Sequence, residues 1–120
     1  MNSSPAKRRI LIVEDEALVA MQLEDMLFEL GHEVAASCAR LEEAVATART
    51  VACDAAVLDI NLSGQKSFPV AEALKSRGVP FFFATGYGVS VLPPGLVGTQ
   101  VLHKPYSLED LKSALLQALA

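Results

Sequence analysis

The chain has little cysteine, no long apolar run and no excess of positive charge, and each absence excludes a class of protein. Its two cysteines, Cys38 and Cys53, are isolated from each other and show no metal-ligand spacing. A disulfide framework is therefore not indicated. We expect both thiols to be buried and to act as small hydrophobic side chains in a reducing cytosol.

The apolar stretches are too short for a membrane span. The run Ile10–Val13 follows the cationic residues 7–9, as in a signal peptide, but three acidic residues at 14–16 end it after four residues. A signal peptide needs an apolar region of roughly 7–15 residues, and a membrane helix needs roughly 20. We therefore expect a cytoplasmic protein without a membrane partner.

Positive charge is also scarce. Ten Lys and Arg residues face fourteen Asp and Glu residues, which gives a net charge of −4. A nucleic-acid partner requires a basic surface, so none is expected. The length of 120 residues and the hydrophobic fraction of 52% are typical of one soluble domain. We expect residues 1–7 to be a disordered lead-in and residues 8–120 to form the domain.

Short apolar runs alternate with segments of helical periodicity along the chain. The runs are rich in β-branched or aromatic residues, as buried strands are, and the periodic segments repeat apolar residues every three or four positions. Gly31 and Gly78 stand where the first and third helices should end, and Ser107 and Asp110 form a capping-box pattern before the last helix. The expected strands are 10–13, 33–37, 55–60, 80–84 and 99–102, and the expected helices are 19–30, 41–48, 69–77 and 108–119.

This alternation predicts an α/β fold, with a parallel sheet covered by helices on both faces. Five strands fit a flavodoxin-like (βα)5 doubly wound sheet of order 2-1-3-4-5, whose ligand crevice lies at the carboxyl ends of strands 1 and 3. Between the fourth and fifth strands, six of the thirteen residues 86–98 are Gly or Pro. Because both residues disfavour helix, the fourth helix should be short or irregular.

Polar side chains follow four of the five expected strands, at ends that a parallel sheet brings to one edge. Glu14 and Asp15 follow the first strand, Asp59 ends the third, Thr85 the fourth and Lys104 the fifth. Taken singly, an acidic residue after a strand is usually a helix N-cap, and a threonine there is an ordinary β-branched residue. The joint pattern favours one shared functional site.

Three carboxylates at one site predict a bound cation. At an effective dielectric of about 20, carboxylates about 5 Å apart repel by roughly 3 kcal/mol per pair. Oxygen ligands without neighbouring His or Cys select Mg²⁺, or Mn²⁺, over Zn²⁺. Such a metal beside a carboxylate and an ammonium is typical of phosphoryl transfer. Asp59 is the central carboxylate and the expected nucleophile, while Lys104 and Thr85 are expected to contact phosphoryl oxygens.

Four segments resemble the signature segments of bacterial response-regulator receiver domains. They are ILIVEDE at 10–16, AVLDINL at 56–62, FFFATGY at 81–87 and HKPY at 103–106. The resemblance covers residues 8–119 and implies a phosphorelay switch. A histidine kinase or phosphotransfer protein would phosphorylate Asp59, and partner binding would change in response. Thr85 and Lys104 match the family's switch hydroxyl and phosphate-binding lysine.

The resemblance also implies a ligand set for Mg²⁺. Asp15, Asp59 and the backbone carbonyl of Asn61 would hold the ion, and Glu14 would contribute through water. Asn61 and Tyr87 would modulate hydrolysis of the acyl phosphate. Such a domain is not otherwise an enzyme, because it catalyses only its own phosphorylation and slow dephosphorylation.

Two features set the chain apart within that family. Val101 stands three residues before Lys104, where the family often carries an aromatic switch residue. The FATGY run resembles a subset of receivers that lack this aromatic and are associated with HWE-type histidine kinases. We therefore hypothesise that phosphorylation orders the segment 86–98 instead.

Alternative interpretations remain open. An aspartyl-phosphate phosphatase would carry its nucleophile in a DxD pattern after the first strand, whereas this chain has DxN after the third. A pseudo-receiver would keep the fold without phosphorylation, and the intact set of acceptor, metal, hydroxyl and lysine residues argues against it. We expect a stand-alone receiver that acts on a downstream protein target, with a missing output domain as the alternative. Side chains of the first helix should select the kinase.

Overall fold

The computed structural model describes residues 7–86 and 92–120. It contains five strands in one parallel sheet and four α-helices, and no helix among the described residues is both long and apolar enough to cross a bilayer. The strands are β1 (Arg9–Val13), β2 (Glu33–Cys38), β3 (Ala55–Asp59), β6 (Phe81–Thr85) and β7 (Val101–His103). The helices are α1 (Ala17–Glu29), α2 (Leu41–Thr50), α3 (Phe68–Ser76) and α4 (Leu108–Leu119).

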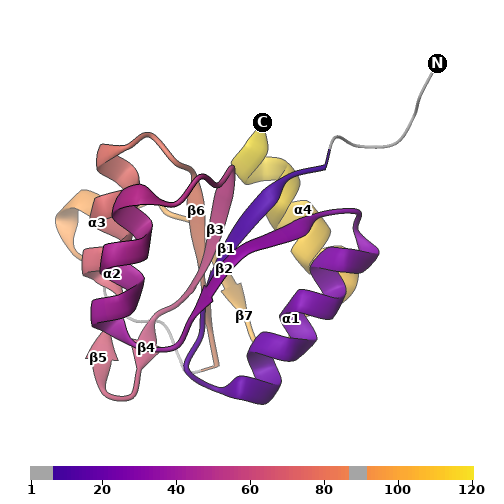
Figure 1. The fold of residues 1–120 in the computed structure, drawn as a ribbon, viewed down its shortest axis with the longest axis horizontal. Helices are drawn as coiled ribbons and strands as arrows, with labels where there is room; N and C mark the ends of the chain where they lie inside the picture. Colours follow the sequence, from indigo (N-terminus) through magenta and orange to yellow (C-terminus); the bar gives the residue numbers. More distant parts are fainter. Residues whose placement is uncertain (1–6, 87–91) are drawn as a thin grey trace.

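The sheet has the order β2-β1-β3-β6-β7 with every pair parallel. Helices α2 and α3 cover one face, and α1 and α4 cover the other (Figure 1). Counted along the sheet's own strands, this is the order 2-1-3-4-5. The predicted flavodoxin-like doubly wound fold is confirmed.

Alternating side chains of the central strands fill two separate cores. In β1, Leu11 and Val13 pack toward α2 and α3, whereas Ile10 and Ile12 pack toward α1 and α4. All four side chains are at most 1% exposed. A strand buried on both faces has no polar face, which explains why its sequence is a continuous apolar run.

The ends of three helices agree with the expected local signals. Gly31 and Gly78 follow α1 and α3 with φ of +86° and +72°, a left-handed conformation that glycine adopts without steric cost. Before α4, the Asp110 N–H donates to Ser107 Oγ and the Ser107 N–H donates to Asp110 Oδ2, each at 3.0 Å. The capping box is therefore formed as predicted.

The connection between β6 and β7 contains no α-helix among its described residues. It holds a single 3₁₀ turn, Pro94–Leu96. Leu96 is 1% exposed and joins the core beneath α2 and α3, so its side chain anchors the turn. The prediction that the fourth helix is short or irregular is confirmed for the described part of this connection. Residues 87–91, which include Tyr87, lie outside the described residues.

A hairpin that the sequence analysis missed follows β3 directly. Strand β3 ends at Asp59, one residue earlier than expected, and β4 (Asn61–Leu62) then pairs antiparallel with β5 (Gln65–Lys66). The turn residues Ser63 and Gly64 have φ of +52° and +88°. Two successive positive φ values are the mark of a tight two-residue hairpin turn, which reverses the chain beside the end of β3.

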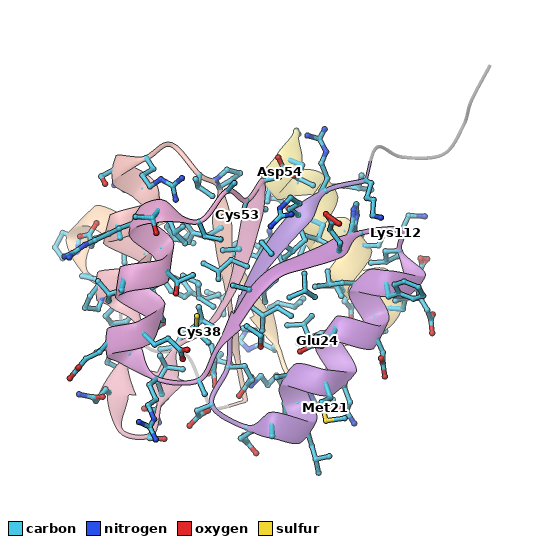
Figure 2. The ribbon with its side chains drawn as sticks, in the orientation of Figure 1. Met21, Glu24, Cys38, Cys53, Asp54 and Lys112 are labelled. Carbon is cyan, nitrogen blue, oxygen red and sulfur yellow. The ribbon has the colours of Figure 1, made fainter. Side chains whose placement is uncertain are left out.

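The two thiols differ in burial. Cys38 is 3% exposed and lies in the core on the α2 side of the sheet, whereas Cys53 is half-buried (Figure 2). Burial raises the pKa of both thiols. The expectation of a buried thiol is therefore confirmed for Cys38 and only partly met for Cys53.

Candidate functional site

Three carboxylates meet where β1 and β3 end. The parallel register pairs Val13 with Leu58, so Glu14 and Asp59 follow on adjacent strands, with Asp15 next in the chain. One carboxylate oxygen from each acidic residue lies within 4.8 Å of the others. Glu14 and Asp59 are buried and Asp15 is half-buried. The structure thus brings the three acidic residues together at the carboxyl edge of the sheet.

Lys104 is the cation beside this cluster. Its N–H donates to the carbonyl of Thr85 at 2.8 Å, which continues the β6–β7 pairing and fixes where the lysine side chain starts. Its Nζ lies 2.6 Å from Glu14 Oε1 and 3.5 Å from Asp59 Oδ2. The lysine therefore contacts two carboxylates, and its shorter contact is to Glu14.

Asp59 is the most strongly perturbed acid in the site. Burial and the neighbouring Glu14 carboxylate raise the pKa of Asp59, whereas the charge of Lys104 lowers it. Burial is the largest of these effects, and the net result is a pKa of about 7. Burial alone would lower the pKa of Lys104, but its hydrogen bond to Glu14 and the charge of Asp59 raise it. Lys104 therefore stays charged in the pH range near neutrality in which Asp59 gains or loses its proton.

Asp15 is held by the missed hairpin. The N–H and the hydroxyl of Ser63 both donate to Asp15 Oδ2, at 2.9 and 3.1 Å. Partial burial would raise the pKa of Asp15, but hydrogen bonds to its carboxylate, the two from Ser63 foremost, together outweigh burial and lower the pKa. In the same hairpin, Asn61 Oδ1 is buried and has no hydrogen-bond partner in the structure. Sequence reasoning missed Ser63, and the Ser63-Gly64 turn signal was the clue available.

An open polar crevice gives access to the cluster. Its lining residues come from the ends of β1, β3, β6 and β7 and from the hairpin; they are Asp15, Glu16, Asp59, Asn61, Ser63, Gly86 and Lys104. Asp59 borders it although its side chain is largely buried. Thr85, 2% exposed, is not among the lining residues that the structure describes. The structure therefore brings Asp15, Asp59 and Lys104 to one crevice, whereas Thr85 is buried and is not part of the described lining.

The donor set fits a hard divalent cation. Three carboxylates and one ammonium leave two negative charges when all four groups are ionised, and no His or Cys belongs to the cluster among the described residues. These properties favour Mg²⁺ or Mn²⁺. Glu14 already accepts from Lys104 at 2.6 Å and from the Glu16 N–H at 3.1 Å. That engagement fits an indirect role for Glu14 better than direct ligation.

Fold and site together define a class of protein, and a family comparison agrees with it. Residues 10–116 match the model of the response regulator receiver domain, so the chain belongs to that family. Receiver domains are the signalling switches of two-component systems and are not metabolic enzymes.

Individual relatives are similar over most of this chain. It is 31% identical over 112 residues to the transcriptional regulatory protein PdtaR of Mycobacterium tuberculosis (strain ATCC 25618 / H37Rv), which covers 90% of this chain and 55% of PdtaR. It is also 32% identical over 114 residues to the two-component response regulator PhoP of Pseudomonas aeruginosa, covering 89% of this chain and 49% of PhoP. The chain thus spans about half the length of these curated relatives.

SdrG from Sphingomonas melonis Fr1 is a similar solved structure of nearly the same length. It is 41% identical, with a TM-score of 0.84, and the match covers 97% of this chain and 99% of SdrG. A second SdrG structure, described as the BeF3-activated conformation, is 42% identical with a TM-score of 0.79 and covers 93% of this chain and 96% of SdrG.

Proposed function

We propose that the protein is a phosphoryl-accepting signalling switch in which Asp59 is the acceptor. One observation carries the proposal: Asp59 borders an open crevice, Lys104 Nζ lies 3.5 Å from its Oδ2, and Glu14 and Asp15 each place a carboxylate oxygen within 4.8 Å of it. A nucleophilic carboxylate that shares a crevice with an ammonium and with further carboxylates able to hold a cation suits phosphoryl transfer. A helix N-cap or a surface ion pair would need neither the burial nor the cluster.

Each group would have a distinct task. An ionised Asp59 oxygen would form a bond to phosphorus while the bond from phosphorus to the donor's imidazole nitrogen breaks. Lys104 would turn from Glu14 toward the new phosphoryl oxygens, because these carry more negative charge than the Glu14 carboxylate. A bound Mg²⁺, held by Asp15, Asp59 and the Asn61 carbonyl, would neutralise charge on the transferred group.

The acceptor is tested by mass spectrometry of the intact protein after incubation with acetyl phosphate and Mg²⁺. We expect one mass gain of about 80 Da, absent in Asp59→Asn and after chelation of the metal. The matched control Asp25→Asn, on the exposed side of α1, should still be labelled. Labelling of Asp59→Asn would place the phosphoryl group elsewhere. No labelling by acetyl phosphate or by any kinase would identify a pseudo-receiver.

We further propose that the α1 surface receives the phosphoryl donor, an HWE-type histidine kinase or a phosphotransfer protein. Leu18, Met21 and Phe28 are 75%, 58% and 81% exposed, and their spacing puts them on one side of the helix (Figure 2 labels Met21). Helix α1 begins just after Glu16, which lines the crevice. A donor that covers this apolar surface could bring its histidine to Asp59.

This partner surface is tested by a matched pair of variants. Met21 on α1 and Leu116 on α4 are both 58% exposed, so a change to glutamate perturbs solvation equally at the two sites. We expect Met21→Glu to slow phosphotransfer from the cognate kinase by about tenfold, or about 1.4 kcal/mol, because a charged side chain in an apolar contact must lose its hydration. Leu116→Glu should have little effect, and both variants should accept phosphate from acetyl phosphate normally. Equal kinase rates for both variants would reject the α1 surface.

A phosphorylated receiver must also present a changed surface to a downstream protein. SdrG has a BeF3-activated conformation, and this chain is 42% identical to it. We therefore propose BeF3⁻ as the phosphoryl mimic for this protein too. The segment 86–98 and the hydroxyl of Thr85 are the proposed responding elements, because Val101 offers no aromatic side chain for the change.

A further inference from the structure

We propose that Ser63 positions Asp15 for the cation, so that the hairpin formed by β4 and β5 sets the affinity for Mg²⁺ and thereby the rate of phosphoryl uptake. This inference rests on the proposed function and extends it to a residue outside the acceptor, metal-ligand and lysine set. Ser63 would touch neither the cation nor the phosphoryl group. It would act through the carboxylate of Asp15.

The contact between the two residues is unusually complete. Ser63 gives both of its donors, the backbone N–H at 2.9 Å and the hydroxyl at 3.1 Å, to the same oxygen, Asp15 Oδ2. Two donors from one residue fix the position of that oxygen and so restrict the rotamers that the Asp15 side chain can adopt. The other oxygen, Oδ1, takes no part in the two bonds from Ser63.

Ser63 can act as a fixed point because the hairpin is anchored on both sides. Asn61 pairs with Lys66 and Leu62 pairs with Gln65, which holds the turn in register. Leu62 is 1% exposed and belongs to the core beneath α2 and α3. Asp15, by contrast, lies between β1 and α1 in a segment without regular structure. Ser63, held by the hairpin, therefore positions the less constrained Asp15.

The backbone of Ser63 separates a positioning role from a purely structural one. Its φ of +52° lies in the left-handed region, where a side chain with a Cβ is disfavoured and glycine is not. A glycine would therefore make the better turn, while it would lose the hydroxyl that reaches Asp15. The two properties can be tested independently at this one position.

The experiment measures the dissociation constant for Mg²⁺ alone, by calorimetric titration, in wild type, Ser63→Ala and Ser63→Gly. Both variants lose the hydroxyl bond to Asp15, and we expect both to bind Mg²⁺ about tenfold more weakly, as is typical when a metal ligand loses its supporting hydrogen bond. Ser63→Gly should at the same time raise the midpoint of thermal unfolding in EDTA, because it relieves the turn. Ser76→Ala is the matched control, since Ser76 is exposed on α3 and its hydroxyl donates to a carbonyl of its own helix.

Stability and affinity that change in opposite directions in Ser63→Gly would support a positioning role that general loosening of the hairpin could not produce. An unchanged dissociation constant in both variants, with wild type binding Mg²⁺ and accepting phosphate, would overturn this inference alone. Tighter binding would also overturn it, because Ser63 would then compete with the cation for Asp15. A wild-type protein that neither binds Mg²⁺ nor accepts phosphate would overturn the proposed function as well.

Discussion

Replacing Asp59 by asparagine is expected to stabilise the cation-free protein at alkaline pH. Asp59 is 7% exposed and lies beside Glu14 within the acidic cluster, so its ionised form destabilises the folded state. Lys104, with Nζ at 3.5 Å, compensates only part of this destabilisation. Asparagine keeps the shape of the side chain and removes the charge. The variant therefore isolates the free energy that ionised Asp59 costs the folded state.

The magnitude follows from the pKa of Asp59. A rise from 3.8 in the unfolded chain to about 7 in the folded protein corresponds to roughly 4 kcal/mol of destabilisation at a pH above both values. Because the folded state holds the proton more tightly, the contribution of Asp59 to stability is fully present below pH 3.8 and is lost as the pH rises through about 7. Relaxation around the charge reduces this figure, so we expect a gain of about 2–4 kcal/mol near pH 8, or on the order of 10 °C in Tm.

Urea denaturation in EDTA at about pH 8, 6.5 and 5 measures the effect. The gap between Asp59→Asn and wild type should be largest near pH 8 and should fall below half that value near pH 5, where folded Asp59 is protonated. Asp25→Asn, an exposed carboxylate on α1, should change stability by less than about 0.5 kcal/mol. Excess Mg²⁺ should narrow the gap by stabilising only wild type.

A variant no more stable than wild type near pH 8 would refute this reasoning. So would a gap that stays constant with pH, because another group would then carry the charge penalty. Either result would remove the electrostatic argument for a cation at this site.

Further consequences follow from other parts of the structure. The apparent affinity for Mg²⁺ should fall about tenfold between pH 8 and pH 6, because the proton on Asp59, with its pKa of about 7, competes with the ion; a calorimetric titration with a flat profile would contradict this. Gly64→Ala should lower the free energy of unfolding by roughly 1–2 kcal/mol, since φ is +88° there, and an unchanged urea midpoint would argue against the tight turn. His32 is 8% exposed, and its Nδ1 accepts a hydrogen bond from the Arg8 N–H at 3.2 Å. Burial and the Arg8 charge lower the pKa of His32, so its contribution to the free energy of unfolding should be fully present above pH 6.5 and should decline as the pH falls below that value. His32→Gln should reduce this decline. BeF3⁻ should increase amide protection in residues 92–98 by hydrogen exchange, and unchanged protection there would count against the ordering hypothesis.

The architecture could be predicted from the sequence because its signals are local. The continuous apolar run Ile10–Val13, the glycines that follow α1 and α3, and the Ser107 capping box each fix one element without knowledge of distant residues. Parallel topology then places the carboxyl ends of the strands at one edge. That rule predicts, from the sequence alone, that Asp15, Asp59 and Lys104 share one site.

Contacts inside the site could not be predicted in the same way. Strands β4 and β5 have two residues each, too few for a periodic pattern, so the hairpin and the bond between Ser63 and Asp15 across 48 positions were missed. The shorter contact of Lys104 to Glu14 and the burial of Thr85 depend on side-chain packing. Strand order decides which residues meet, whereas their pairing depends on the packed structure.

Reductive mapping of the acyl phosphate tests the central claim most directly. Borohydride converts an aspartyl phosphate into homoserine, which peptide mass spectrometry locates in the sequence. After treatment with acetyl phosphate and Mg²⁺, we predict homoserine at position 59 and nowhere else, with none formed in EDTA. Homoserine at position 15, or no homoserine in a protein that binds Mg²⁺, would contradict the assignment of Asp59 as phosphoryl acceptor.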